Sequence, residues 1–209
     1  MRLASLAMLA LATSLTPALS EVREIPGSEF EAGNWIGGAY TDAAGGFSYC
    51  YTTVSYLNGQ TLWLGLYPND TLSILMSQPG VTFKPGQSFE LWVMMETGLP
   101  AIGNGEAWDA DYAGITYTGI AATVDFLNSG RYLRMLGMGI DDGFDVDGIG
   151  PALVQAQECL ARHSGAGGKA SGAEPAVKPP SGVTGLSKPR TSGIGAEGAL
   201  GTPAPKPQP

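Results

Sequence analysis

Apolar side chains recur at every second position along three neighbouring stretches of the chain. These alternating residues are Leu62, Leu64, Leu66, Leu72, Ile74, Met76, Phe89, Leu91, Val93 and Met95. Successive side chains of a β-strand point to opposite faces, so a period of two places all of them on one face of a sheet. Turn-forming residues separate the stretches at Asn58-Gly59, Pro68-Asn69-Asp70 and Lys84-Pro85-Gly86. The pattern predicts an antiparallel meander.

Weaker patterns predict the remaining elements. We expect strands at 35–40, 47–56, 115–120, 131–138 and 144–147, a long loop at 97–114, a short helix at 123–127 and a final helix at 151–162. One side of the final helix carries Leu153, Ala156, Cys159 and Leu160 at three- and four-residue spacing. The predicted fold is therefore mainly β, either an antiparallel β-sandwich or a meander, with a short helix and a C-terminal helix packed on the sheet.

The two ends of the chain differ from its middle. Residues 1–20 combine Arg2, an apolar run of about a dozen residues and small residues at Ala18 and Ser20, which is typical of a cleaved secretory signal peptide. Residues 164–209 are rich in Gly, Pro, Ala, Ser and Lys and lack apolar periodicity, which predicts a disordered tail. The predicted folded domain is residues 21–163. Export to the periplasm or beyond is expected, without a segment that spans the membrane.

Charge divides along the same boundary. Residues 21–163 hold 17 acidic and 5 basic side chains, a net charge of 5 − 17 = −12, whereas residues 164–209 hold 5 basic and 2 acidic, a net charge of +3. An acidic domain argues against nucleic acid as a partner, because phosphates require a basic surface. For the tail, three interpretations stay open: a solvated tether, contact with anionic envelope polymers, or folding back onto its own domain.

Two cysteines, Cys50 and Cys159, lie in the predicted domain. Two cysteines in one exported domain most simply pair. Cys50 shares a strand face with Thr52 and Val54, so a bond to Cys159 would hold the final helix across that face. The disulfide is predicted to be structural.

The residues offer little for catalysis. His163 is the single histidine and lies at the border with the tail, where a triad of nucleophile, histidine and acid is difficult to assemble. Zinc sites require several His or Cys, and neither a phosphate-binding GxxxxGK[ST] motif nor a GxGxxG motif after a strand is present. We expect no catalytic residues and no cofactor, and the sequence assigns no metal site.

Two groups of side chains are candidate binding sites. The first mixes acids and aromatics in a Gly-rich stretch, as a calcium or sugar site does: Glu106, Trp108, Asp109, Asp111 and Tyr112. A solvated acidic loop is the competing interpretation. The second is an aromatic platform on the face opposite the leucines, formed by Trp63, Tyr67 and Trp92. Its competing interpretation is burial of both sheet faces.

The order of several short motifs resembles a known family. The motifs are Gly33-Asn34-Trp35, Gly46-Phe47 before Cys50, Asn58-Gly59, Asp125-Phe126-Leu127 with Gly130-Arg131, Phe144 to Gly148 and Glu158-Cys159-Leu160. In this order the chain resembles the invasion-associated locus B proteins of proteobacteria and their uncharacterised periplasmic relatives. The resemblance implies a periplasmic or envelope-associated β-domain with paired cysteines and supplies no catalytic residues.

Three functions follow as hypotheses. The first is a non-enzymatic exported envelope binding or accessory protein, whose partner is an envelope protein or a glycan. The second is a carbohydrate- or calcium-dependent binding protein or hydrolase that uses residues 106–112. The third is a surface structural protein.

Overall fold

The computed structural model describes residues 22–96, 98–137 and 139–165. The predicted signal peptide and all but the first two residues of the predicted tail lie outside the described residues. No helix in the described part of the chain is long and apolar enough to cross a membrane.

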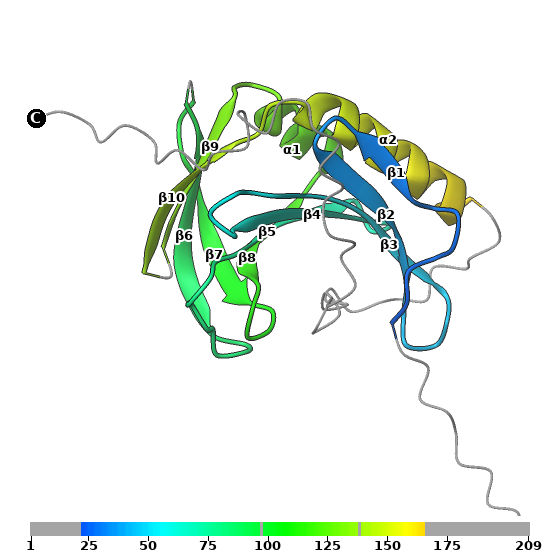
Figure 1. Ribbon diagram of the computed structural model, residues 1–209, viewed down its shortest axis with the longest axis horizontal. Helices are drawn as coiled ribbons and strands as arrows, with labels where there is room; N and C mark the ends of the chain where they lie inside the picture. The colour runs from blue at the N-terminus through cyan, green and yellow to red at the C-terminus, as the bar shows by residue number, and fades with distance from the viewer. Residues whose placement is uncertain (1–21, 97, 138, 166–209) are drawn as a thin grey trace, which may run out of the picture.

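Ten strands within these residues form one antiparallel sheet in the order β1-β2-β3-β4-β5-β8-β7-β6-β9-β10. The strands are β1 Phe30–Ala32, β2 Trp35–Thr41, β3 Phe47–Ser55, β4 Thr61–Tyr67, β5 Thr71–Ser77, β6 Ser88–Met95, β7 Ala101–Ala107, β8 Ala113–Thr118, β9 Tyr132–Gly137 and β10 Ile140–Asp145. The helices are α1 Ile120–Leu127 and α2 Ile149–Ser164. In Figure 1 the sheet arches from β2 and β3 through β4 and β5 to β6–β10, with both helices on one side of it. The predicted mainly-β fold is confirmed, as a single sheet.

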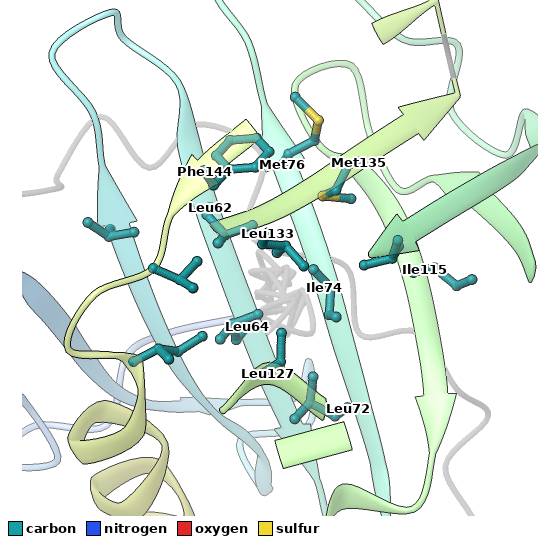
Figure 2. Close-up of a cluster of buried hydrophobic side chains, with 14 of the residues drawn as sticks. Leu62, Leu64, Leu72, Ile74, Met76, Ile115, Leu127, Leu133, Met135 and Phe144 are labelled. Carbon is teal, nitrogen blue, oxygen red and sulfur yellow. The ribbon is translucent and has the colours of Figure 1, made fainter. Parts of the chain in front are cut away.

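The face of the sheet toward the helices holds the main core. Leucines of β4 and alternating residues of β5 meet β9, β10 and α1 there, and Figure 2 shows Leu64, Ile74, Leu127 and Leu133 converging. The alternation predicted between 61 and 95 therefore marks the core face correctly. Two hydrogen bonds join residues far apart in the sequence: Trp35 Nε1 donates to Asp147 O at 3.0 Å, and Tyr56 OH donates to Asp145 O at 2.8 Å.

The predicted disulfide is confirmed. Cys50 of β3 and Cys159 of α2 are bonded, with their Cα atoms 6.1 Å apart, and both side chains are buried. Leu153 and Ala156 lie on the same buried side of α2. The helix therefore packs against β2 and β3 as its apolar spacing predicts.

Four local predictions were wrong. The last strand, β10, spans Ile140–Asp145 rather than 144–147. The stretch 97–114 is not one long loop, because it contains β7, whose period-two pattern is concealed by Gly103 and Gly105. β1, Phe30–Ala32, precedes 35–40, where the first strand was expected. α1 begins at Ile120 rather than Thr123, because the Ile120 N–H donates to Asp70 Oδ1 at 3.0 Å, a capping contact from the distant β4–β5 turn.

Candidate functional site

The face of the sheet turned away from the helices carries a cluster of aromatic side chains. We call the following buried residues the aromatic cluster: Tyr40, Tyr49, Tyr51, Trp63 and Tyr67, with Leu75. They come from β2, β3, β4 and β5 at positions that alternate with the core leucines. The strand period thus produces two hydrophobic layers, one on each face.

Ring contacts hold this cluster together. Tyr51 stacks nearly parallel to Trp63, with centroids 6.0 Å apart and planes at 8°. Tyr49 meets Trp63 edge-on, with centroids 5.4 Å apart, and its ring is tilted by 48° to that of Tyr67, with centroids 5.2 Å apart. Offset-stacked and edge-to-face pairs are the favourable geometries for aromatic rings. The cluster is accordingly well packed.

The two candidate sites predicted from sequence meet here in part. Trp108, in the turn between β7 and β8, lies 6.5 Å from Trp63 and 6.4 Å from Tyr67, measured between ring centroids. Tyr112 packs against the same cluster, and both Trp108 and Tyr112 are only partly buried. The reason is strand order: β8 pairs with β5, which brings the β7–β8 turn beside β4 and β5.

The acids of the predicted loop do not converge on one point. Asp109 is 2% exposed, and its Oδ1 accepts the N–H groups of Asp111 at 2.8 Å and Tyr112 at 2.7 Å. It therefore orders the turn that positions Trp108. Glu106 and Asp111 are exposed. Among the described residues, no group of three or more His, Cys, Asp or Glu side chains is placed to hold a metal ion.

Burial controls the protonation of the cluster. It raises the pKa of Tyr40 to about 12, with the nearby Glu24 carboxylate adding to the shift. Burial also raises the pKa of Tyr49 and Tyr51 well above the ordinary value of 10. The Tyr51 hydroxyl donates to Glu24 Oε1 at 2.5 Å, whereas the Tyr49 hydroxyl has no hydrogen-bond partner in the described part of the chain. At neutral pH these tyrosines are therefore protonated.

Trp92, the third predicted platform residue, lies elsewhere. β5, β8 and β7 separate its strand, β6, from the strand of Trp63. Trp92 is opposite Ile102 of β7 and Leu136 of β9, and these three residues, which we call the apolar row, share one face. Trp92 is 39% and Ile102 52% exposed, and Leu136 is partly buried. The structure therefore does not join Trp63, Tyr67 and Trp92 into one exposed platform.

Polar groups border the apolar row. The Trp92 indole donates from Nε1 to Glu90 Oε1 at 2.8 Å, which holds a carboxylate beside an exposed ring. Leu99, in the β6–β7 turn, is 90% exposed. Ile102 and Leu136 were not predicted to flank Trp92. Ile102 lies in a Gly-rich stretch that was expected to be a loop, and Leu136 meets Trp92 only because β9 pairs with β6.

His163 lies in the last turn of α2. Its ring stacks on Phe47 of β3 with centroids 5.4 Å apart and planes at 23°. Cys159, one turn earlier, is bonded to Cys50 of the same strand. The histidine thus adds packing at the end of the helix that the disulfide anchors.

Comparisons with known proteins give a match among solved structures but none among sequences. No protein-family model matches the chain, and no curated protein sequence matches it. Among solved structures, the chain is similar to invasion associated protein B from Bartonella henselae, with a TM-score of 0.48 and 12% sequence identity. The similarity covers 64% of this chain and 97% of that chain.

Proposed function

We propose that this protein is a non-enzymatic binding or accessory protein of the cell envelope, and that the apolar row is its contact surface for a partner protein. The observation that carries the proposal is the exposure of Trp92 and Ile102, side by side on adjacent strands. Contiguous exposed apolar side chains on a folded domain mark interaction sites.

The chemistry of the row suits recognition. Tryptophan is among the residues that contribute most to protein interfaces, because a large rigid ring is buried at low entropic cost. β6 pairs with both β7 and β9, so the row sits on a rigid scaffold. Glu90 beside the indole favours a partner that presents a cation next to an apolar group.

Export belongs to the same proposal. The signal-peptide pattern of residues 1–20 supports it, and a buried disulfide between Cys50 and Cys159 is typical of oxidising compartments. Membership of the invasion-associated locus B family is proposed on the order of the sequence motifs. The periplasm or the extracellular space is the proposed location.

Site-specific photo-crosslinking in the native envelope tests the function. A benzophenone amino acid replaces Ile102 in the row, and in a matched control it replaces Val154 on α2, which is also 52% exposed. We expect position 102, and not position 154, to capture one reproducible envelope protein, and capture to be lost in the additional variant Trp92→Ala.

With the purified partner, Trp92→Ala should weaken binding about 30-fold, the equivalent of roughly 2 kcal/mol at an interface centre. Equal capture from both positions would contradict the proposal.

A glycan-binding function is the second candidate, located at the aromatic cluster. It is favoured by the partly buried Trp108, whose ring centroid lies 6.4 Å from that of Tyr67. Sugars bind by stacking on aromatic rings such as this indole. A glycan that raises the melting temperature should lose this effect in Trp108→Ala and keep it in Trp92→Ala. An unchanged melting temperature across a broad panel of glycans would exclude this candidate.

A further inference from the structure

The environment of Trp92 points to a specific ligand chemistry. The indole is 39% exposed, and apolar Ile102 and Leu136 lie on its two sides. The indole Nε1 donates a hydrogen bond to the Glu90 carboxylate, which holds that carboxylate beside the ring. Proline rings pack on exposed indoles, as proline-rich peptides do in aromatic-lined grooves. A cation next to the proline would meet both the ring face and the Glu90 carboxylate. A peptide with a lysine next to a proline would place the proline ring on the Trp92 indole and the lysine ammonium at the Glu90 carboxylate.

The chain itself contains this dipeptide outside the described residues. Lysine precedes proline at Lys178-Pro179, Lys188-Pro189 and Lys206-Pro207, and the last of these lies in an alternating run with Pro203, Pro205 and Pro209. The charge of residues 164–209 is +3, opposite to the −12 of residues 21–163. Charge complementarity therefore favours contact between the two parts of the chain.

Chain length selects among the three dipeptides. The row lies on β6, β7 and β9, whereas α2 ends on the part of the sheet formed by β1–β3. A domain of this size is about 35–40 Å across. A Gly-rich chain spans on average about 20 Å over the 13 residues from Gly165 to Lys178, and about 32–38 Å over the 41 residues to Lys206. The average span to Lys206, and not the span to Lys178, matches the width of the domain.

We infer that the apolar row binds the lysine-proline segment 203–209 of the same chain, with Pro207 on the Trp92 indole and Lys206 at Glu90. The inference rests on the proposed function, since it makes the segment a built-in competitor for the surface that contacts the partner. A partner must displace the segment, so its removal should increase partner capture.

Crosslinking of the purified full chain tests this inference. With the benzophenone at position 102, we expect crosslinks to a peptide that contains Lys206, and none from the control at position 154. Lys206→Glu should lower the yield about two- to fivefold, the equivalent of one exposed cation contact. Glu90→Gln should lower it similarly. A mixture of isotope-labelled and unlabelled chains distinguishes contact within one chain from contact between two copies.

Three results would overturn the inference: equal yields from positions 102 and 154, a yield unchanged by Lys206→Glu, or crosslinks only between labelled and unlabelled chains. The proposed function fails separately. Capture of an envelope protein in cells without any tail crosslink supports the partner surface and excludes self-binding. Tail crosslinks in the full chain, with no envelope capture even after residues 203–209 are removed, support self-binding and exclude the partner surface.

Discussion

Gly65 occupies the middle of the aromatic cluster, where the surrounding rings leave no room for a side chain. A Cβ atom at this position would lie 2.4 Å from Trp63 Cη2 and 3.2 Å from the Tyr67 hydroxyl. The Trp63 indole is held by the stacked Tyr51 ring, so it cannot move aside freely. We expect Gly65→Ala to lower the free energy of unfolding by about 1–3 kcal/mol, measured by chemical denaturation.

Gly98→Ala is the matched control for this substitution. An added Cβ at Gly98 meets no atom within 4 Å, and its backbone is not in the left-handed region. The control should change the free energy of unfolding by less than about 0.5 kcal/mol. If Gly65→Ala is as stable as the control, the Trp63 and Tyr67 rings can move to make room for the added methyl group, and the aromatic cluster is packed less tightly than these distances indicate.

The buried tyrosines predict how stability responds to alkaline pH. Full or partial burial raises the pKa of seven tyrosines above the ordinary value of 10: Tyr40, Tyr49, Tyr51, Tyr56, Tyr67, Tyr112 and Tyr117. Unfolded tyrosines lose protons near pH 10, whereas Tyr40 and Tyr117 keep theirs to about pH 12 in the fold. The unfolded state then binds fewer protons, so the free energy of unfolding falls as pH rises from 10 toward 12.

Two spectra recorded along one pH titration test this expectation. Tyrosinate absorbance should rise mainly in a cooperative step that coincides with loss of the near-ultraviolet circular dichroism. A gradual rise of the absorbance to completion, while the dichroism is unchanged, would show that the hydroxyls ionise inside the fold. Tyr40→Phe removes one of these groups and should weaken the pH dependence without abolishing it.

Which residues share a face could be predicted from the sequence, but not which residues meet. The alternation placed Trp63 and Tyr67 opposite the leucines, and the structure agrees. Their contact with Trp108 depends on β8 pairing with β5, which leaves β6 and β7 beyond it in the sheet. Strand pairing of this kind depends on long-range contacts that local periodicity does not encode. For the same reason, Trp92 could not be separated from Trp63 by sequence alone.

At the level of elements, α2 is tied to β3 by the disulfide. The bond between Cys50 and Cys159 closes a loop with a sequence separation of 109. A loop of that length restricts the unfolded chain by about 4–5 kcal/mol in the entropy model, and measured losses are typically about 2–5 kcal/mol. We expect the double variant Cys50→Ala, Cys159→Ala to lose stability within this range in urea.

The helix itself gives the control for that experiment. Val154 is exposed on α2, so Val154→Ala keeps the disulfide and should leave the free energy of unfolding within about 0.5 kcal/mol of the original. A loss below about 1 kcal/mol in the cysteine variant would mean that Leu153, Ala156 and the His163–Phe47 stack hold α2 without the bond.

β7 illustrates why one element escaped prediction. In Ala101–Ala107 every second residue toward the core is small: Gly103 faces Ile115, and Gly105 faces Phe89 and Gly114. Glycine contributes no apolar signal and weakens strand propensity, so the stretch resembles a loop. Backbone pairing with β6 and close packing against large neighbours maintain the strand instead. Ile102 of the apolar row lies on this strand, so it was not predicted either.

At the scale of the whole molecule, the dominant electrostatic feature is the excess of negative charge in residues 21–163, net −12. Mutual repulsion of these carboxylates opposes folding most strongly at low ionic strength. Salt also weakens the ion pairs Arg131–Asp145 at 2.9 Å and Arg134–Asp141 at 2.7 Å, each of which has one solvent-exposed partner, but such a pair contributes only about 0–1 kcal/mol. Screening of the repulsion should therefore prevail over the loss of the pairs.

We expect the melting temperature to rise by about 3–5 °C between roughly 10 mM and 150 mM sodium chloride, the shift that about 1 kcal/mol produces in a domain of this size. A variant with Glu31→Gln and Glu158→Gln, both exposed and outside the two ion pairs, should melt higher at low salt and respond less to added salt. A melting temperature that falls with salt would instead mean that the Arg131 and Arg134 pairs outweigh the repulsion. The carboxylates would then serve mainly to pair with arginines of the same domain rather than to bind a cationic partner.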